Sequence, residues 1–187
     1  MKGMVGIIVI ALAILLIGGC ACISAKNALI GQDEAVTAAW SQVDNQLKRR
    51  SDLIPQLVET VKGITKHENE VFKLLTDSRA RLAGATDVEA RAKAEGEVSS
   101  ALSRLLAFTE SNPELKSSQN FAALQDELAG TENRIAVARK TYNEAVRRFN
   151  TSIRQFPGSI FAGQLGFSPR KYFEVEESAK AAPQIKF

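Results

Sequence analysis

Apolar side chains recur along the chain from residue 36 at alternating steps of four and three residues. The positions are Val36, Trp40, Val43, Leu47, Arg50, Ile54, Leu57, Val61 and Ile64, and only Arg50 breaks the apolar character. We call this set the apolar stripe. Its spacing is the heptad pattern that packs one side of an α-helix against other helices, as in coiled coils. Because the spacing continues on both sides of Pro55, it predicts one helix that is kinked at Pro55 and ends near Gly63.

Two shorter helices are predicted next. The first begins near His67 and ends around Gly84-Ala85, and one side of it carries Val71, Leu74, Leu75, Ser78 and Leu82. Thr86-Asp87 provides an N-cap for the second, because a short side-chain oxygen accepts hydrogen bonds from the free N–H groups of the first turn. The apolar residues of the second helix are Val98, Leu102, Leu105 and Leu106. Asn112-Pro113 ends it, since a residue before proline is biased away from helical geometry.

A fourth helix is predicted to begin near Ser118. Its residues seven apart are large and apolar, namely Phe121, Leu128, Ile135, Tyr142, Phe149 and Phe156. Smaller residues mostly fill the interleaved positions, which are Leu124, Thr131, Ala138, Ala145 and Ser152. Pro157-Gly158 is the expected end. Four amphipathic helices joined by short turns, with no alternation typical of strands, predict an all-α fold, an up-and-down four-helix bundle.

The N-terminus carries a different pattern. Residues 4 to 23 contain no charged side chain, and a run of this length can cross the hydrocarbon core of a membrane. The run has two readings, an uncleaved transmembrane helix or a signal that ends in Gly18-Gly19-Cys20, which resembles a bacterial lipobox with Cys20 as the lipidated residue. Lys2 before the run favours a cytoplasmic N-terminus, whereas Lys26 close behind the run counts against it, which leaves a slight preference for a domain on the extracytoplasmic, periplasmic side.

These patterns divide the chain into three parts. We expect a membrane anchor or lipoprotein signal over residues 1–25, the helical bundle over 26–157 and an irregular segment over 158–187. That last segment is rich in apolar residues, with Phe161, Leu165, Phe167, Tyr172 and Phe173 as candidates for an interaction surface. Either these residues pack on the bundle and cover one end of it, or they present an apolar patch to a partner or membrane.

The chemistry of the chain argues against several functions. Its 24 basic and 21 acidic residues give a net charge of +3, too small to create a broad attractive field for nucleic acid. The single histidine, His67, lacks the second histidine of a zinc protease motif, since residue 71 is Val71. Cys20 and Cys22 both lie at the membrane exit and cannot staple the bundle. The sequence therefore predicts no catalytic residue, no metal site and no cofactor, and a protein that is not an enzyme.

Arg50 is the informative irregularity. A guanidinium on an apolar stripe needs acceptors, because an unpaired buried charge is costly. The acidic residue best placed to supply them is Glu132, which flanks the stripe of the fourth helix. We therefore predict a structural ion pair between Arg50 and Glu132. The alternatives are a ligand-binding or partner-binding arginine, or an arginine whose stem lies along the apolar surface while its charged end reaches water.

Several short motifs together resemble the LemA family. They are Ala39-Trp40-Ser41-Gln42-Val43-Asp44, Lys48-Arg49-Arg50-Ser51-Asp52-Leu53-Ile54-Pro55, Asn120-Phe121, Gly130-Thr131-Glu132-Asn133-Arg134-Ile135, Tyr142-Asn143, Phe156-Pro157-Gly158, Gly166-Phe167 and Tyr172-Phe173. The resemblance covers most of the chain after residue 30. It implies a small helical bundle behind an N-terminal membrane segment in a bacterial envelope protein. The family has no agreed activity, so the resemblance assigns no site residues.

The hypothesis that follows is a non-enzymatic, membrane-anchored adaptor or scaffold of the bacterial cell envelope. Helix faces and the segment from Phe161 to Phe173 would provide its contact surface for an unknown protein partner, or for a second copy in a homo-oligomer. The alternative is a regulatory subunit of a membrane enzyme such as an envelope protease. A hydrolase would be a third class, but the sequence shows no constellation for one. The sequence leaves the partner and the pathway open.

Overall fold

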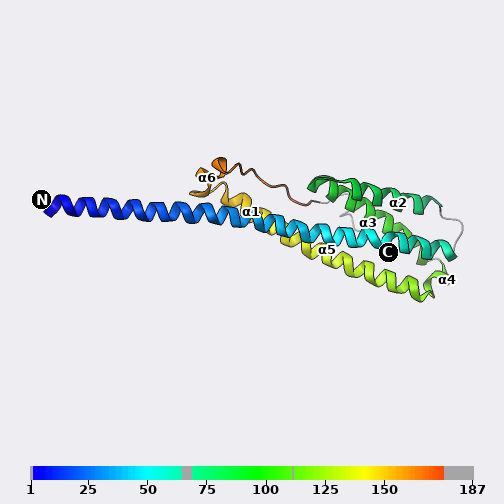
Figure 1. Cartoon of the computed structure of the whole chain (residues 1–187). Helices are drawn as coiled ribbons and strands as arrows, with labels where there is room; N and C mark the ends of the chain where they lie inside the picture. The colour runs from blue at the N-terminus through cyan, green and yellow to red at the C-terminus, as the bar shows by residue number, and fades with distance from the viewer. Residues whose placement is uncertain (1, 65–68, 111, 175–187) are drawn as a thin grey trace, which may run out of the picture. The chain divides into compact units, whose positions relative to one another are not determined.

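The computed structural model describes residues 2–64, 69–110 and 112–174, and in these ranges it contains helices and no strand, which confirms the all-α prediction. The helices are α1 (Lys2–Ile64), α2 (Asn69–Gly84), α3 (Val88–Glu110), α4 (Pro113–Lys116), α5 (Gln119–Ser152) and α6 (Gly158–Gln164) (Figure 1). The predicted start of the second helix near His67 lies outside the described residues. The four-residue helix α4 was not predicted. It begins at Pro113, whose fixed φ suits the first helical position.

The apolar stripe lies on α1, which continues through Pro55 without ending, as predicted. Val36, Val43, Leu47, Arg50, Ile54, Leu57 and Val61 are all buried. The same uninterrupted helix also contains the apolar run of residues 4 to 23, so one element carries both the candidate anchor and the core stripe.

The start of α3 is capped as expected. The Asp87 side-chain oxygen Oδ1 accepts hydrogen bonds from the backbone N–H groups of Glu89 and Ala90, at 3.0 and 2.9 Å. Such a cap satisfies two of the donors that a helix leaves free at its N-terminus.

The large residues of α5 are buried up to Phe149, but the prediction for Phe156 was wrong. Phe121, Leu128, Ile135, Tyr142 and Phe149 are buried. Phe156 is 81% exposed, because α5 ends at Ser152 rather than at Pro157-Gly158. The chain turns early so that Gly158 can approach Ser152 closely. A Cβ atom at Gly158 would lie 2.2 Å from the Ser152 carbonyl oxygen.

The described residues separate into two compact units. The N-terminal unit contains residues 2–38 and 144–170, and the bundle unit contains residues 39–143 and 171–174. The two longest helices, α1 and α5, contribute residues to both units. We describe each unit by itself.

The bundle unit is a four-helix bundle, as predicted. It packs α2 and α3 against the parts of α1 and α5 that belong to this unit (Figure 1). Its core contains buried aromatic residues such as Phe72 and Phe121, together with fully buried aliphatic side chains, namely Val43, Leu47, Leu57, Leu75, Val98, Leu105 and Ile135. Leu115 of α4 is also fully buried. Burial of this apolar surface is the main favourable term that holds the helices together.

The N-terminal unit packs the C-terminal part of α5, α6 and the following residues against α1. Leu29 of α1 is 2% exposed, and Gly158 and Ala162 of α6 are buried. Beyond α6 the chain has no regular secondary structure from Gly166 to Glu174 except a turn at its start. We call residues 165–174 the C-terminal segment.

Candidate functional site

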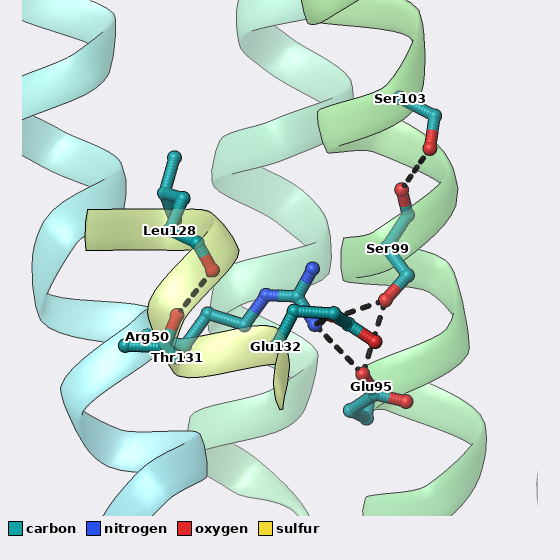
Figure 2. A network of polar contacts seen from close by, with 7 residues as sticks. All are labelled: Arg50, Glu95, Ser99, Ser103, Leu128, Thr131 and Glu132. Carbon is teal, nitrogen blue, oxygen red and sulfur yellow. Dashed lines mark hydrogen bonds and ion pairs between the residues drawn. The ribbon is translucent and has the colours of Figure 1, made fainter. Parts of the chain in front are cut away.

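The most unusual group in the bundle unit is a polar cluster inside its core. It consists of Arg50 from α1, Glu95 and Ser99 from α3, and Glu132 from α5, and we call it the Arg50 cluster (Figure 2). Arg50 is 5% exposed and Glu95 is 2% exposed. Charged side chains this deeply buried need partners, since each has lost its water.

One guanidinium nitrogen of Arg50 makes all three contacts. Its NH1 atom lies 2.9 Å from Glu95 Oε1, 3.0 Å from Ser99 Oγ and 2.6 Å from Glu132 Oε2. The Ser99 hydroxyl donates in turn to Glu95 Oε1 at 3.0 Å. Figure 2 shows the arginine reaching from α1 toward these side chains of α3 and α5. The predicted partner Glu132 is therefore within ion-pair distance of Arg50, at the edge of the core, where its side chain is 48% exposed.

Glu95 was missed by the sequence reasoning, although a signal for it exists. Glu95, Val98, Leu102 and Leu105 follow steps of three and four residues on α3, so Glu95 occupies an apolar position just as Arg50 does. Two opposite charges, each on the buried side of its own helix, would have been the indication of a pair.

Two hydroxyl groups near the cluster are satisfied within their own helices. The Thr131 hydroxyl, fully buried on α5, donates to the Leu128 carbonyl oxygen at 2.8 Å, and the Ser103 hydroxyl donates to the Ser99 carbonyl oxygen at 2.9 Å (Figure 2). Arg50 Nε has no hydrogen-bond partner among the described residues. Arg50 and Glu95 are buried between three helices, and Glu132 reaches Arg50 from the edge of the core. This arrangement suits a structural role more than contact with a substrate.

Ion pairs on the outside of the bundle unit connect the same helices. Arg49 pairs with Glu127, Arg81 with Glu97 and Arg91 with Asp44, and at least one partner in each pair is well exposed to solvent. Exposed pairs of this kind contribute little to stability. The Arg79 side chain makes a different contact, since its Nε donates to the Ser51 carbonyl oxygen of α1 at 2.9 Å.

Phe173 anchors the last part of the C-terminal segment in the bundle unit. It is 1% exposed and lies against Trp40, with 6.1 Å between ring centroids, and under the Arg139 guanidinium, 5.0 Å from the ring. The Asn143 side chain holds its backbone at both ends. Asn143 Oδ1 accepts from Phe173 N–H at 2.9 Å, and Asn143 Nδ2 donates to Phe173 O at 3.1 Å.

Two further contacts fix the residues before Phe173. The Tyr142 hydroxyl donates to the Lys171 carbonyl oxygen at 2.8 Å, and Lys171 Nζ donates to Glu89 Oε2 at 2.7 Å. The hydrogen bond and the charge of Glu89 raise the pKa of Lys171 above its ordinary value. Tyr172 between them is 38% exposed. Of the candidate surface residues in the bundle unit, Tyr172 is therefore accessible and Phe173 is not.

The other three candidate surface residues belong to the N-terminal unit. Phe161, Leu165 and Phe167 are all half-buried there, and the Phe167 ring packs edge-on against Phe149, with centroids 5.4 Å apart. Asn150 holds Arg170 in the way that Asn143 holds Phe173. Its Oδ1 accepts from Arg170 N–H at 2.8 Å, and its Nδ2 donates to Arg170 O at 2.9 Å.

A shallow groove of about 410 Å³ lies on the outer side of α1 and α5 in the bundle unit. Its lining residues are Gln42, Gln46, Asn133, Arg134, Val137, Ala138 and Thr141. Val137 is 66% exposed, an unusual value for an aliphatic residue on a bundle helix, and Gln46 Oε1 is buried with no hydrogen-bond partner among the described residues. The sequence reasoning gave no indication of this groove.

Near the N-terminus, the described part of α1 contains one window long and apolar enough to cross a membrane, and 6% of that window is buried. Cys20 and Cys22 lie in this region and are exposed, free thiols. Within the described ranges, no three side chains of the metal-binding types gather in one place.

Comparison with known proteins adds the family. The LemA family model matches residues 39–187. Magnetosome protein MamQ 2 of Paramagnetospirillum magneticum and magnetosome protein MamQ of Magnetospirillum gryphiswaldense are each 25% identical to the chain, over 85% of this chain and 68% of the relative. Protein LemA of Metamycoplasma hominis is 25% identical, over 81% of this chain and 70% of the relative. Because the family match extends over more than half of the sequence, the chain belongs to the LemA family.

Proposed function

We propose that this protein is a non-enzymatic adaptor or scaffold, held at the membrane of the bacterial cell envelope by the N-terminal part of α1. The observation that carries the proposal is that one uninterrupted helix contains both the apolar run of residues 4–23 and the buried stripe of the bundle. A helix of this kind presents a folded domain at a membrane surface. The domain faces the extracytoplasmic side in this proposal.

The interior of the bundle unit supports a non-enzymatic role. The buried charges in its described residues are Arg50 and Glu95, which pair with each other; Ser99 is hydrogen-bonded to both, and the half-exposed Glu132 also pairs with Arg50. Catalytic groups normally line an accessible pocket, where they meet the substrate. Here the charges are used to satisfy one another.

The contact surface that we assign to the adaptor is the groove between α1 and α5. It is lined mainly by uncharged side chains, and its exposed apolar lining residue is Val137. Interface cores are depleted in charged residues in the same way. Tyr172 is the member of the C-terminal segment that we add to the surface, because it is exposed and aromatic.

The test places a photo-crosslinking amino acid at Val137 in the full chain in its own membrane. A matched variant carries it at Lys140, which is exposed on the same helix but does not line the groove. We expect a discrete cross-linked species from the Val137 position and none from the Lys140 position.

The outcomes separate the function classes. A stoichiometric non-enzymatic partner or a second copy at Val137 supports the adaptor. A membrane protease or another enzyme as the cross-linked partner favours a regulatory subunit instead. Equal cross-linking at both positions, or turnover by the purified protein in a broad hydrolase screen, contradicts the proposal.

A further inference from the structure

The N-terminal unit places a turn of the chain close to the apolar run of α1. Gly158 at the start of α6 packs beside Leu29, such that a Cβ atom at Gly158 would lie 3.5 Å from Leu29 Cδ2. Leu29 is six residues beyond Ile23, the last residue of the apolar run. At the rise of an α-helix this separation is about 9 Å along the axis.

The path of the chain shows which part of the unit lies nearest to that run. Arg170 pairs with Asp33 at 2.7 Å and is held by Asn150, so both ends of the excursion from residue 150 to 170 are close to Asp33. The middle of the excursion reaches Leu29, one helical turn closer to the apolar run. Figure 1 shows α6 beside the N-terminal part of α1 in agreement with this path. We call residues 153–160 the membrane-proximal turn.

The membrane-proximal turn exposes large apolar side chains. Phe156 is 81% exposed and Ile160 is 54% exposed, while Ile30 on the adjacent part of α1 is 46% exposed. Single exposed apolar residues are ordinary on a protein surface, but a group that includes a nearly bare phenylalanine marks an interaction site. Transfer of these exposed apolar side chains from water into an apolar environment is therefore favourable.

The charges in the turn itself, and on α1 before Asp33, are basic. From Ala145 to Phe173 the sequence contains no aspartate or glutamate, and on α1 the first acidic residue is Asp33. Arg154 in the turn and Lys26 on α1 are both exposed. Apolar residues flanked by Arg and Lys are the combination that binds the headgroup region of anionic lipid.

We propose that the membrane-proximal turn inserts Phe156 and Ile160 into the headgroup region of the membrane that α1 crosses, with Arg154 on the lipid phosphates. The polar region on each side of the hydrocarbon core is about 5–8 Å thick. Leu29, about 9 Å beyond Ile23, lies just outside this region, so the contact requires the Phe156 and Ile160 side chains to extend a few ångströms toward the bilayer. The inference rests on the proposed membrane anchoring by α1. It adds a second, peripheral contact between the folded part of the chain and the lipid.

Brominated lipids test this contact, because they quench a tryptophan that touches their acyl chains. The full chain, which contains 1 tryptophan, Trp40, is reconstituted into phosphatidylcholine vesicles with a minority of phosphatidylglycerol. One variant carries F156W. The matched control carries V137W, at an exposed apolar position of the bundle unit. A third variant, L16W, reports on the apolar run itself. The unsubstituted chain gives the emission of Trp40 alone.

We expect shallow brominated lipids to remove most of the emission that F156W adds, and none of the emission that V137W adds. Quenching of L16W by deep brominated lipids shows that α1 is in the bilayer. If L16W is quenched and F156W behaves like V137W, the turn does not touch the membrane and this inference is wrong, while the anchoring stands. If L16W is not quenched, the anchoring fails and the inference fails with it. A cross-linked protein that covers Phe156 in the native membrane would also overturn it.

Discussion

Arg50 shows how a charged residue is accommodated in a largely apolar core. Its NH1 atom contacts Glu95, Ser99 and Glu132, and the two carboxylates differ in their surroundings. The Glu95 side chain is 2% exposed and that of Glu132 is 48% exposed. The Arg50–Glu95 pair therefore matters most for the free energy of unfolding. Glu132 is half-exposed, so water still solvates its carboxylate when its partner is removed.

Substitution of the pair should show strong coupling. We expect R50M or E95M alone to lower the free energy of unfolding by about 3–5 kcal/mol, since each leaves one buried charge without its main partner. The double variant should regain most of that loss, or exceed the stability of the original chain by about 1–4 kcal/mol. Urea unfolding of the full chain in detergent, followed by Trp40 fluorescence, measures all three.

Two variants at exposed positions serve as controls. R49M removes the neighbouring arginine, whose side chain is 59% exposed, and should change the free energy of unfolding by less than about 1 kcal/mol. E132A should likewise cost about 1 kcal/mol or less. Additive effects of R50M and E95M would show that the buried pair is not the stabilising unit.

The elements that could be predicted from sequence are those with a repeating pattern. The apolar stripe of α1 and the heptad positions of α5 up to Phe149 were predicted because side chains facing a core must recur at the helical period. The cap at Asp87 was also predictable, since it depends on a local residue type. Of the two acidic partners of Arg50, Glu132 was predicted because it flanks the apolar positions of α5. Glu95 was missed because it had not been recognised as one of the inward-facing positions of α3.

The features that were not predicted depend on contacts that produce no repeating pattern in the sequence. Asn143 and Asn150 each hold the backbone of the C-terminal segment with a side-chain amide, and nothing in the sequence marks them apart from other asparagines on a helix. The early end of α5 follows from the close approach of Gly158 to Ser152, which is a property of the packed unit.

The turn between α5 and α6 allows a test with two glycines of one short helix. G158A adds a Cβ atom 2.2 Å from the Ser152 carbonyl oxygen, whereas G163A adds one with nothing within 4 Å. We expect G158A to destabilise the turn by about 1–3 kcal/mol through overpacking. G163A should be neutral or stabilise it by about 0.4–1 kcal/mol through the unfolded state.

Amide hydrogen exchange over residues 153–165 measures this difference, because the turn can open without unfolding of the bundle unit. Faster exchange in G158A with unchanged exchange in α2 and α3 is the expected result. Equal exchange in both variants would mean that the chain relaxes around the added atom, so that the close approach of Gly158 does not determine where α5 ends.

At the scale of the whole molecule, the proposed membrane anchoring can take two forms. α1 is long and apolar enough near its N-terminus to be a spanning helix, while Gly18-Gly19-Cys20 resembles a lipobox in which Cys20 would be lipidated. We expect the intact mass of protein extracted from membranes to equal that of the complete sequence. Loss of residues 1–19 together with an added acyl mass would contradict this and assign Cys20 as the anchor.

A C20S variant is the control for this measurement. In a spanning protein the substitution shifts the mass by the sulfur-to-oxygen difference alone, and the protein stays in the membrane fraction. In a lipoprotein it blocks processing, so the acyl mass disappears. The C22S variant, two residues further along α1, should behave like the unsubstituted chain in both cases.

The Arg50 cluster also bears on which fold the chain selects. The rest of the apolar stripe is nearly uniform, with valine, leucine or isoleucine at most positions from Val43 to Val61. Helices with such faces can slide by one heptad and still bury their side chains. A slip of α1 by seven residues would bring Val43 or Leu57 opposite Glu95 and move Arg50 among aliphatic side chains. The Arg50–Glu95 pair therefore favours the native register of α1, because a slipped alignment leaves both buried charges unpaired.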